Sequence, residues 1–335
     1  MKKSVSLKKL SEITGYSVAT ISRVINKKGK YSVETEKKVL KAIKEYNYVP
    51  NVIARSLRTN HSPTIGIIVP DITNEFFSRI TLAVQLKLLS HGFTAIVCNT
   101  NENKNLEERY MQMLQSQNIS GIIYICCKQL YDGNYNSTVP KVYIDRKPTI
   151  LTQGESPIIV QSDNYEGGRL AVRELINSGC KNIISIMDKR DLSSKISRQA
   201  GIIDELKAHD MEAQIYYTNH VTYKGIYSVI KKILDNNDLS FDGIFCYNDI
   251  GAMSVVKALS KRNIKIPESV KIMGFDGISC TKYCTPSIST IRQPMEKMGK
   301  YAAQIILRLI NREKIEEREY NLPVKLIKRQ STMSE

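Results

Sequence analysis

The chain has 335 residues, of which 42% are hydrophobic and 24% charged, and its formal net charge is +16. This length and balance are typical of a globular protein of two or three domains. No stretch approaches the roughly 18 consecutive apolar residues of a membrane helix, and the basic start MKKSVSLKKL lacks the apolar core of a secretory signal, so we expect a cytoplasmic protein with no membrane partner.

The positive charge is concentrated near the N-terminus. Residues 1–61 contain 14 Lys and Arg against 4 Asp and Glu, whereas residues 62–335 contain 35 against 29. A short segment with this excess predicts a partner that carries many phosphates, or an anionic membrane surface.

The first 49 residues predict a small all-α domain. Apolar residues recur at helical spacing from Leu7 to Thr14, Gly15-Tyr16-Ser17 interrupts the pattern, and the spacing resumes from Val18 to Asn26. A helix, a tight turn with glycine and a second helix are typical of a helix-turn-helix. A third helix, about residues 32–46, is expected to bury Val33, Val39, Leu40 and Ile43.

From Thr64 onward, short apolar runs alternate with helical segments. Such runs predict parallel sheets covered on both faces, and about 270 residues favour two doubly wound α/β lobes over one sheet. The predicted strands are 65–70, 93–99, 121–126, 141–145, 182–187, 214–218, 243–248 and 270–276. The predicted helices are 76–91, 105–117, 166–178, 198–208, 223–235, 249–262 and 294–312.

Polar residues close many of these predicted strands. Ligands of doubly wound folds bind beyond the carboxyl ends of the strands, where a ring of such side chains would converge. N-capping of the following helix explains the same residues equally well at many individual positions. The strand-end residues are Asp71, Asn99, Asp145, Asp188, Asn248, Asp249 and Asp276.

The sequence offers little that points to a metal, a cofactor or catalysis. The seven cysteines are interpreted as free core thiols, and the C-x3-C pair Cys280 and Cys284 has no nearby histidine to complete a metal site. Dinucleotide, Walker and nucleophile-elbow motifs do not occur, and His61, His91, His209 and His220 are dispersed. We therefore expect no enzyme activity, no cofactor and no metal.

Several motifs in order resemble the LacI/GalR family of bacterial repressors. They are GYSVATISRVIN, EYNYVPNVIARSLR, TIGIIVPDITNEFFSRI, VKIMGFDGIS, TPSISTIRQP and the C-terminal LPVKLIKRQST. Within the family, VINKKG, SDNYEGGR, RQAG, GFDG and STIRQP look most like Gram-positive sugar-operon repressors of the sucrose type. The resemblance implies a helix-turn-helix domain over 1–49, a hinge helix and linker over 50–62, and a two-lobed, periplasmic-binding-protein-like, dimerising sugar sensor over 63–335.

The resemblance also implies a DNA-binding set. Val18 and Ala19 begin the recognition helix and can contact only thymine methyl groups, whereas Arg23 can read guanine. Tyr48 packs near the hinge, either in the core or facing DNA, and Leu57 is the hinge residue that wedges into the minor groove. Phosphate contacts are expected from Ser17, Thr20, Ser22, Asn26, Ser32 and Thr35, and hinge contacts from Asn51, Ala54 and Arg55.

The effector cleft implied by the family pattern combines aromatic faces with charged and amide groups. Its expected residues are Asp71, Asn74, Phe76, Phe77, Asp145, Arg146, Asp163, Ser194, Arg198, His220, Asn248 and Asp276. The chain departs from the pattern in two places. Met187-Asp188-Lys189-Arg190 stands where the family often has Gly-Pro, and His220 or Val221 stands where it often has an aromatic residue.

These observations predict a homodimeric repressor of a sugar-utilisation operon, controlled by a small sugar or sugar phosphate of the sucrose, fructose or ribose type. Dimerisation follows because one helix-turn-helix reads too few base pairs. Three alternatives stay open: a global carbon regulator that uses a phosphocarrier protein as corepressor, a sugar-binding protein that does not bind DNA, and a sugar-modifying enzyme.

Overall fold

The computed structural model describes residues 5–25, 27, 29–48, 62–125, 139–148, 156–236 and 240–333. The chain separates into two compact units, Met1–Ser62 and Pro63–Glu335. The hinge predicted over 50–62 lies outside the described residues except for Ser62. In the described part of the chain, the helices are too short or too polar to cross a membrane.

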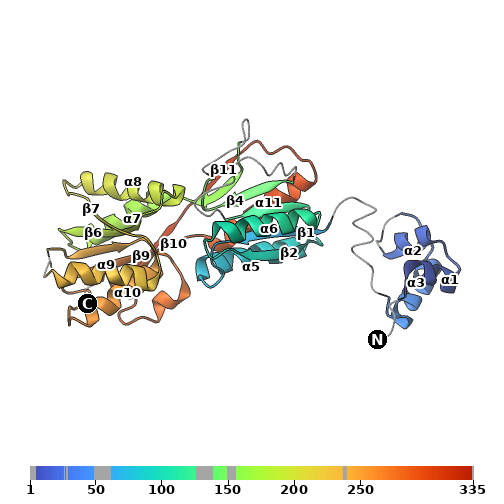
Figure 1. The fold of residues 1–335 in the computed structure, drawn as a ribbon, viewed down its shortest axis with the longest axis horizontal. Coiled ribbons are helices and arrows are strands. Elements are labelled where there is room, and N and C mark those ends of the chain that lie inside the picture. The colour runs from blue at the N-terminus through green and yellow to red at the C-terminus, as the bar shows by residue number, and fades with distance from the viewer. Residues whose placement is uncertain are drawn as a thin grey trace. The chain divides into compact units, whose positions relative to one another are not determined.

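The first unit contains the three predicted helices, α1 (Leu7–Thr14), α2 (Val18–Ile25) and α3 (Val33–Glu45) (Figure 1). Gly15 ends α1 with φ 71°, a left-handed conformation that glycine adopts without a Cβ penalty, and its N–H donates to Ser11 O. This sets the tight turn before α2. The small core that holds the three helices together consists of Leu10, Ile21, Val24, Val39 and Ala42.

Two of the residues expected inside this unit lie on its surface. The side chains of Val33 and Leu40 are 69% and 49% exposed, so the prediction of a buried position was wrong for both. Val33 is the first residue of α3, before the helix contacts the core. Leu40 follows the buried Val39 by one residue, which is a rotation of about 100° away from the core face.

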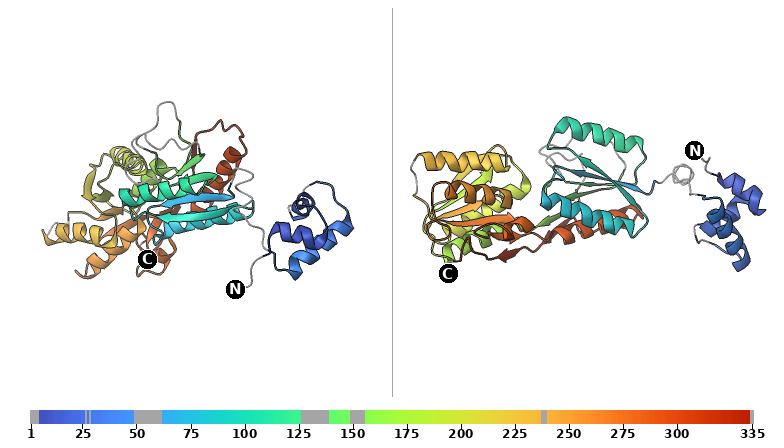
Figure 2. Two further views of the ribbon diagram at one scale, coloured as in Figure 1. Left: turned by 45° about the vertical axis from the view of Figure 1, so that its right-hand side comes forward. Right: turned by 90° about the horizontal axis from the view of Figure 1, so that it is seen from below.

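The second unit has two lobes, each built on a six-stranded sheet (Figure 2). The N-terminal lobe has the strand order β11-β5-β4-β3-β1-β2, and all neighbouring strands are parallel. Its elements are β1 (Thr64–Val69), α5 (Glu75–Leu89), β2 (Thr94–Asn99), α6 (Lys104–Ser116), β3 (Gly121–Tyr124), β4 (Lys141–Ile144), β5 (Ile159–Ser162), α11 (Met295–Ile310) and β11 (Glu319–Leu322).

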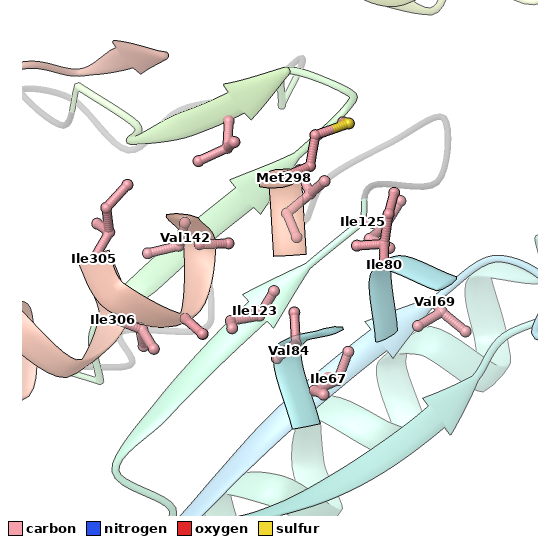
Figure 3. Close-up of a cluster of buried hydrophobic side chains, with 14 of the residues drawn as sticks. Ile67, Val69, Ile80, Val84, Ile123, Ile125, Val142, Met298, Ile305 and Ile306 are labelled. Atoms are coloured by element: carbon pink, nitrogen blue, oxygen red, sulfur yellow. The ribbon is translucent and has the colours of Figure 1, made fainter. Parts of the chain in front are cut away.

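Both faces of this sheet are buried. Side chains of β1 alternate between them: Ile65, Ile67 and Val69 pack with α5 and α11, whereas Ile68 packs with α6. Figure 3 shows the first of these clusters, where Ile80 and Val84 of α5 and Ile305 and Ile306 of α11 meet the strands. This two-sided burial explains why the strands are apolar at almost every position.

The C-terminal lobe has the order β12-β10-β9-β8-β6-β7, with only the edge strand β12 antiparallel to its neighbour. One cluster joins its sheet to α7 and α8 and a second joins it to α9 and α10. Its elements are α7 (Asn164–Asn177), β6 (Ile183–Asp188), α8 (Ser193–Lys207), β7 (Gln214–Thr218), α9 (Tyr223–Asp235), β8 (Gly243–Cys246), α10 (Asp249–Ser260), β9 (Lys271–Asp276), η1 (Ser279–Lys282), β10 (Ser289–Arg292) and β12 (Lys325–Ile327).

The chain passes between the lobes after β5, after β10 and after β11. The apolar-run analysis did not predict these three strands. Half or more of the residues are polar in β5, which reads IVQS, and in β10, which reads STIR. β11 reads EYNL, which has no apolar run because it lies at the sheet edge beside β5. All eight strands that were predicted are present, and β12 falls within the C-terminal motif LPVKLIKRQST.

Candidate functional site

A cavity of about 440 Å³ opens between the two lobes of the second unit, beyond the carboxyl ends of their strands. Both lobes contribute to its walls, which combine aromatic, amide, carboxylate and guanidinium side chains. The lining residues are Asp71, Thr73, Asn74, Phe76, Phe77, Asn101, Glu102, Asp145, Arg146, Arg190, Arg198, Asn219, His220, Val221, Thr222, Tyr247, Asn248, Asp276 and Gln293.

Ten of the twelve residues proposed for an effector cleft line this cavity, and two do not. Asp163 instead caps α7, where its Oδ1 accepts from the N–H of Glu166 at 3.0 Å. Ser194 is buried within α8, with 1% of its surface exposed. The residues brought together are Asp71, Asn74, Phe76, Phe77, Asp145, Arg146, Arg198, His220, Asn248 and Asp276.

Capping and cavity lining are not exclusive at the strand ends. Asn74 caps α5 by accepting from Phe76 N at 3.0 Å, and Asn248 caps α10 by accepting from Gly251 N at 2.9 Å. Both also line the cavity. Capping fixes the side-chain carbonyl and leaves the amide NH₂ group as a donor, which in Asn248 lies 3.3 Å from Val221 O.

The N-terminal lobe contributes two aromatic rings to the cavity wall, and an arginine side chain lies over one of them. Phe76 and Phe77 meet edge to face with ring centroids 5.1 Å apart. The guanidinium of Arg146 lies 5.5 Å from the centroid of Phe77, and only 5% of its side chain is exposed. Apolar ring faces next to a fixed charge suit a ligand that has both C–H surfaces and polar groups.

Arg198 of α8 is held rigidly at the opposite wall. Its guanidinium lies 3.4 Å from the ring centroid of Phe275, and its Nη2 donates to Asn164 Oδ1 at 2.7 Å. Helices α7 and α8 approach closely at two glycines: a Cβ on Gly168 would lie 2.2 Å from Arg198 O, and one on Gly201 would lie 2.0 Å from Tyr165 O. The EGGR and RQAG motifs thus place Arg198 through helix packing.

Asp276 ends β9 in an unusual backbone conformation, with φ 119°. Its Oδ1 accepts from Gln293 Nε2 at 2.7 Å, and burial together with the neighbouring Asp249 carboxylate raises the pKa of Asp276 well above its usual value. The Oε1 of Gln293 is buried without a hydrogen-bond partner among the described residues. These two side chains therefore offer fixed groups to a ligand hydroxyl.

The loop after β9 is tied down by a residue that does not line the cavity. Asp249, fully buried at the start of α10, accepts from Gly277 N at 2.7 Å and Ile278 N at 2.8 Å. Burial raises the pKa of Asp249 to about 7. Its strand-end position suggested a ligand contact, but the structure gives it a positioning role.

Nine lining residues were absent from the predicted set. Tyr247 directly follows β8 and Gln293 directly follows β10, so the strand-end rule could have found the first and, with β10 recognised, the second. The others lie on loops with no periodic pattern. The nine are Thr73, Asn101, Glu102, Arg190, Asn219, Val221, Thr222, Tyr247 and Gln293.

The first unit presents a separate candidate interface on α2. Val18, Ala19 and Arg23 are exposed, whereas Ile21 and Val24 of the same helix are buried. The short side chains at the start of α2 would let the backbone approach base edges, and Arg23 extends a fork of donors. This is the arrangement that a recognition helix requires.

Four hydroxyl groups at the helix starts are ordered in pairs. Ser17 Oγ lies 2.9 Å from Thr20 Oγ1, and Ser32 Oγ lies 2.8 Å from Thr35 Oγ1.

Tyr48 packs partly buried against the small core, so the structure favours its core role. Ser22 is half-buried. Asn26, Asn51, Ala54, Arg55 and Leu57 lie outside the described residues.

Comparison with known proteins matches two families. The family described as bacterial regulatory proteins, lacI family, matches residues 7–51, and the periplasmic binding protein-like domain matches residues 172–332. The first covers the helix-turn-helix and the second covers most of the C-terminal lobe.

Individual relatives extend the similarity over nearly the whole chain. The chain is 33% identical to a ribose operon repressor of Halalkalibacterium halodurans, covering 94% of this chain and 93% of that protein. It is 34% identical to a sucrose operon repressor of Streptococcus mutans, covering 96% and 98%. A solved periplasmic binding protein/LacI transcriptional regulator from Alkaliphilus metalliredigens, complexed with D-xylulofuranose, is 32% identical, with a TM-score of 0.74 over 82% of this chain and 100% of that one.

Proposed function

The chain belongs to the LacI family of bacterial regulatory proteins, and from this premise we propose that it represses a sugar-utilisation operon by binding operator DNA. A small sugar or sugar phosphate would bind in the inter-lobe cavity and control that binding. The observation that carries the proposal is the presence, in one chain, of an exposed recognition helix and a polar, aromatic-walled cavity between two lobes.

The cavity supports control by lobe closure. Asn74, Phe77 and Arg146 come from the N-terminal lobe, whereas Arg198 and Asp276 come from the C-terminal lobe. A ligand that contacts both walls binds the closed arrangement more tightly than the open one, and this difference in affinity is what can shift the equilibrium. Because the N-terminal lobe continues through residues 50–62 into the DNA-binding unit, the shift would change operator affinity. The sugar is bound and not converted in this proposal.

A second copy of the chain is the proposed partner of α5. Leu82, Leu86 and Leu89 of this helix are 55%, 59% and 67% exposed. Their spacing of four and three residues places them on one face of the helix. Three exposed leucines on one helix face are typical of an interaction surface. A two-fold dimer would bring two recognition helices to two half-sites of one operator.

The test is a two-step screen on the full-length protein. Thermal shift with ribose, fructose, xylulose, sucrose and their phosphates identifies ligands, and fluorescence anisotropy measures release of a DNA fragment selected from genomic sequence. We expect specific DNA binding that at least one stabilising sugar changes. Sugar binding without DNA binding would favour the solute-binding alternative, turnover would favour the enzyme, and dependence of DNA binding on a phosphocarrier protein would favour the global regulator.

The hinge can be tested at Leu57, whose role rests on the family resemblance. Leu57→Ala is expected to weaken specific operator binding at least tenfold, about 1.4 kcal/mol, while sugar affinity stays unchanged. An apolar wedge opens a base step and bends the duplex, and an alanine is too short to do so. Anisotropy with specific and random DNA checks this. Equal operator affinity in the variant would leave Leu57 no role beyond packing.

A further inference from the structure

An ion-pair cluster bridges the two lobes at the cavity. Arg146 follows β4 of the N-terminal lobe, and Arg190 follows β6 of the C-terminal lobe. Glu102 lies between them on the turn after β2: its Oε1 accepts from Arg146 Nη1 at 3.2 Å, and its Oε2 accepts from Arg190 Nη1. One carboxylate therefore joins a guanidinium from each lobe.

Asp188 fixes the orientation of the Arg190 side chain. Asp188, fully buried at the end of β6, accepts from Arg190 Nε at 3.0 Å and from Nη2 at 2.6 Å. This two-point contact occupies one edge of the guanidinium plane and directs Nη1 toward the cavity. Asp188 thus orients the Arg190 guanidinium so that it can donate to an anion in the cavity. Both residues belong to the segment that departs from the family's usual Gly-Pro.

Glu102 is held less firmly than the arginines it contacts. Its side chain is 29% exposed, against 5% for Arg146 and 19% for Arg190. It lies on a turn where both Asn101 and Glu102 have positive φ, 48° and 57°. Neither is glycine, so both residues of this loop adopt a backbone conformation that side chains with a Cβ rarely adopt. Glu102 is the most exposed of the three side chains, so its displacement uncovers less buried surface than displacement of either arginine.

We propose that Glu102 occupies an anion site between Arg146 and Arg190 and that the phosphate group of a sugar phosphate displaces it when the effector binds. This inference rests on the proposed function and specifies its ligand class. A phosphate offers three charged acceptor oxygens, so it can accept from guanidinium groups on both lobes as the carboxylate does. A neutral sugar hydroxyl can accept from a guanidinium, but it carries no negative charge to balance two of them.

In this proposal the Glu102 carboxylate competes with the ligand's phosphate group for the two arginines. Glu102→Gln removes the competing charge and leaves both arginines in place. We expect the gain in affinity for the best-binding sugar phosphate to exceed any change for the corresponding neutral sugar about tenfold. Glu108→Gln is the matched control, because Glu108 carries the same charge nearby but pairs with Lys104 at 3.9 Å on the surface of α6.

The experiment is titration calorimetry in phosphate-free buffer on wild type and both variants, with ribose, fructose and sucrose, their monophosphates, and inorganic phosphate. A gain for sugar phosphates that exceeds the change for neutral sugars about tenfold, and that Glu108→Gln does not share, supports the proposal. An equal change for neutral sugars and sugar phosphates would overturn it by reducing Glu102 to a latch between the lobes. Inorganic phosphate that binds as tightly as the sugar phosphates would overturn the assignment to a sugar phosphate.

Failure of the inference and failure of the proposed function are distinguishable. If neutral sugars bind and release operator DNA while their phosphates do neither, the ligand class is wrong and the repressor function stands. If neither class binds wild type or Glu102→Gln while operator binding persists, the proposed effector control fails and the inference fails with it.

Discussion

Replacing Arg198 with lysine should shift sugar-dependent release of the operator to about a hundredfold higher sugar concentration while leaving operator binding itself intact. We expect the affinity of the effector to fall about a hundredfold, or 2.7 kcal/mol. Arg198 is 2% exposed, stacks on Phe275 and donates to Asn164 Oδ1 and to Tyr247 O, the latter at 2.5 Å. A lysine ammonium keeps the charge but has neither the planar face nor the fork of donors that this position uses.

The measurement for Arg198→Lys is operator release against effector concentration by fluorescence anisotropy. Arg169→Lys is the matched control, because Arg169 lies on the adjacent helix α7, is about one-third exposed and pairs with Glu205 instead of facing the cavity. Melting temperatures without ligand separate a loss of folding from a loss of binding. A release curve for Arg198→Lys that coincides with wild type would exclude Arg198 from the effector site.

Leu86→Glu should convert the proposed dimer to a monomer and lower operator affinity at least a hundredfold. Leu86 is 59% exposed at the middle of the leucine stripe on α5, so a glutamate there would place two like charges across a two-fold interface. A monomer presents one recognition helix and loses the high effective concentration of the second half-site. Sugar affinity should stay within twofold, because the cavity lies within one chain.

Analytical ultracentrifugation and operator titration test Leu86→Glu together. Ile196→Glu is the control, since Ile196 is an apolar residue of similar exposure, 53%, on α8 of the other lobe. We expect this control to remain dimeric and to bind operator as wild type does. A dimeric Leu86→Glu protein with full operator affinity would move the interface away from α5.

The sequence by itself was sufficient to predict the helices and strands whose buried residues form a local apolar pattern. The helix-turn-helix follows from the spacing of apolar residues around Gly15, and eight of the strands follow from apolar runs that two covered sheet faces require. The strand-end rule and the resemblance together identified ten residues that the cavity brings together. Asp71, Asp145, Asn248 and Asp276 were recognisable because carboxyl ends of parallel strands converge whatever the ligand.

Only the tertiary structure decided which polar residues lie together at the cavity. Asp163, Asp188 and Asp249 have the same strand-end signature as Asp276, but one caps a helix, one supports Arg190 and one anchors a loop. The cluster at Glu102 joins residues 88 positions apart and has no sequence signal, because its partners approach through the packing of two lobes. Local pattern determines which face of an element is buried, whereas the neighbours of a loop side chain depend on contacts between elements that are distant in the chain.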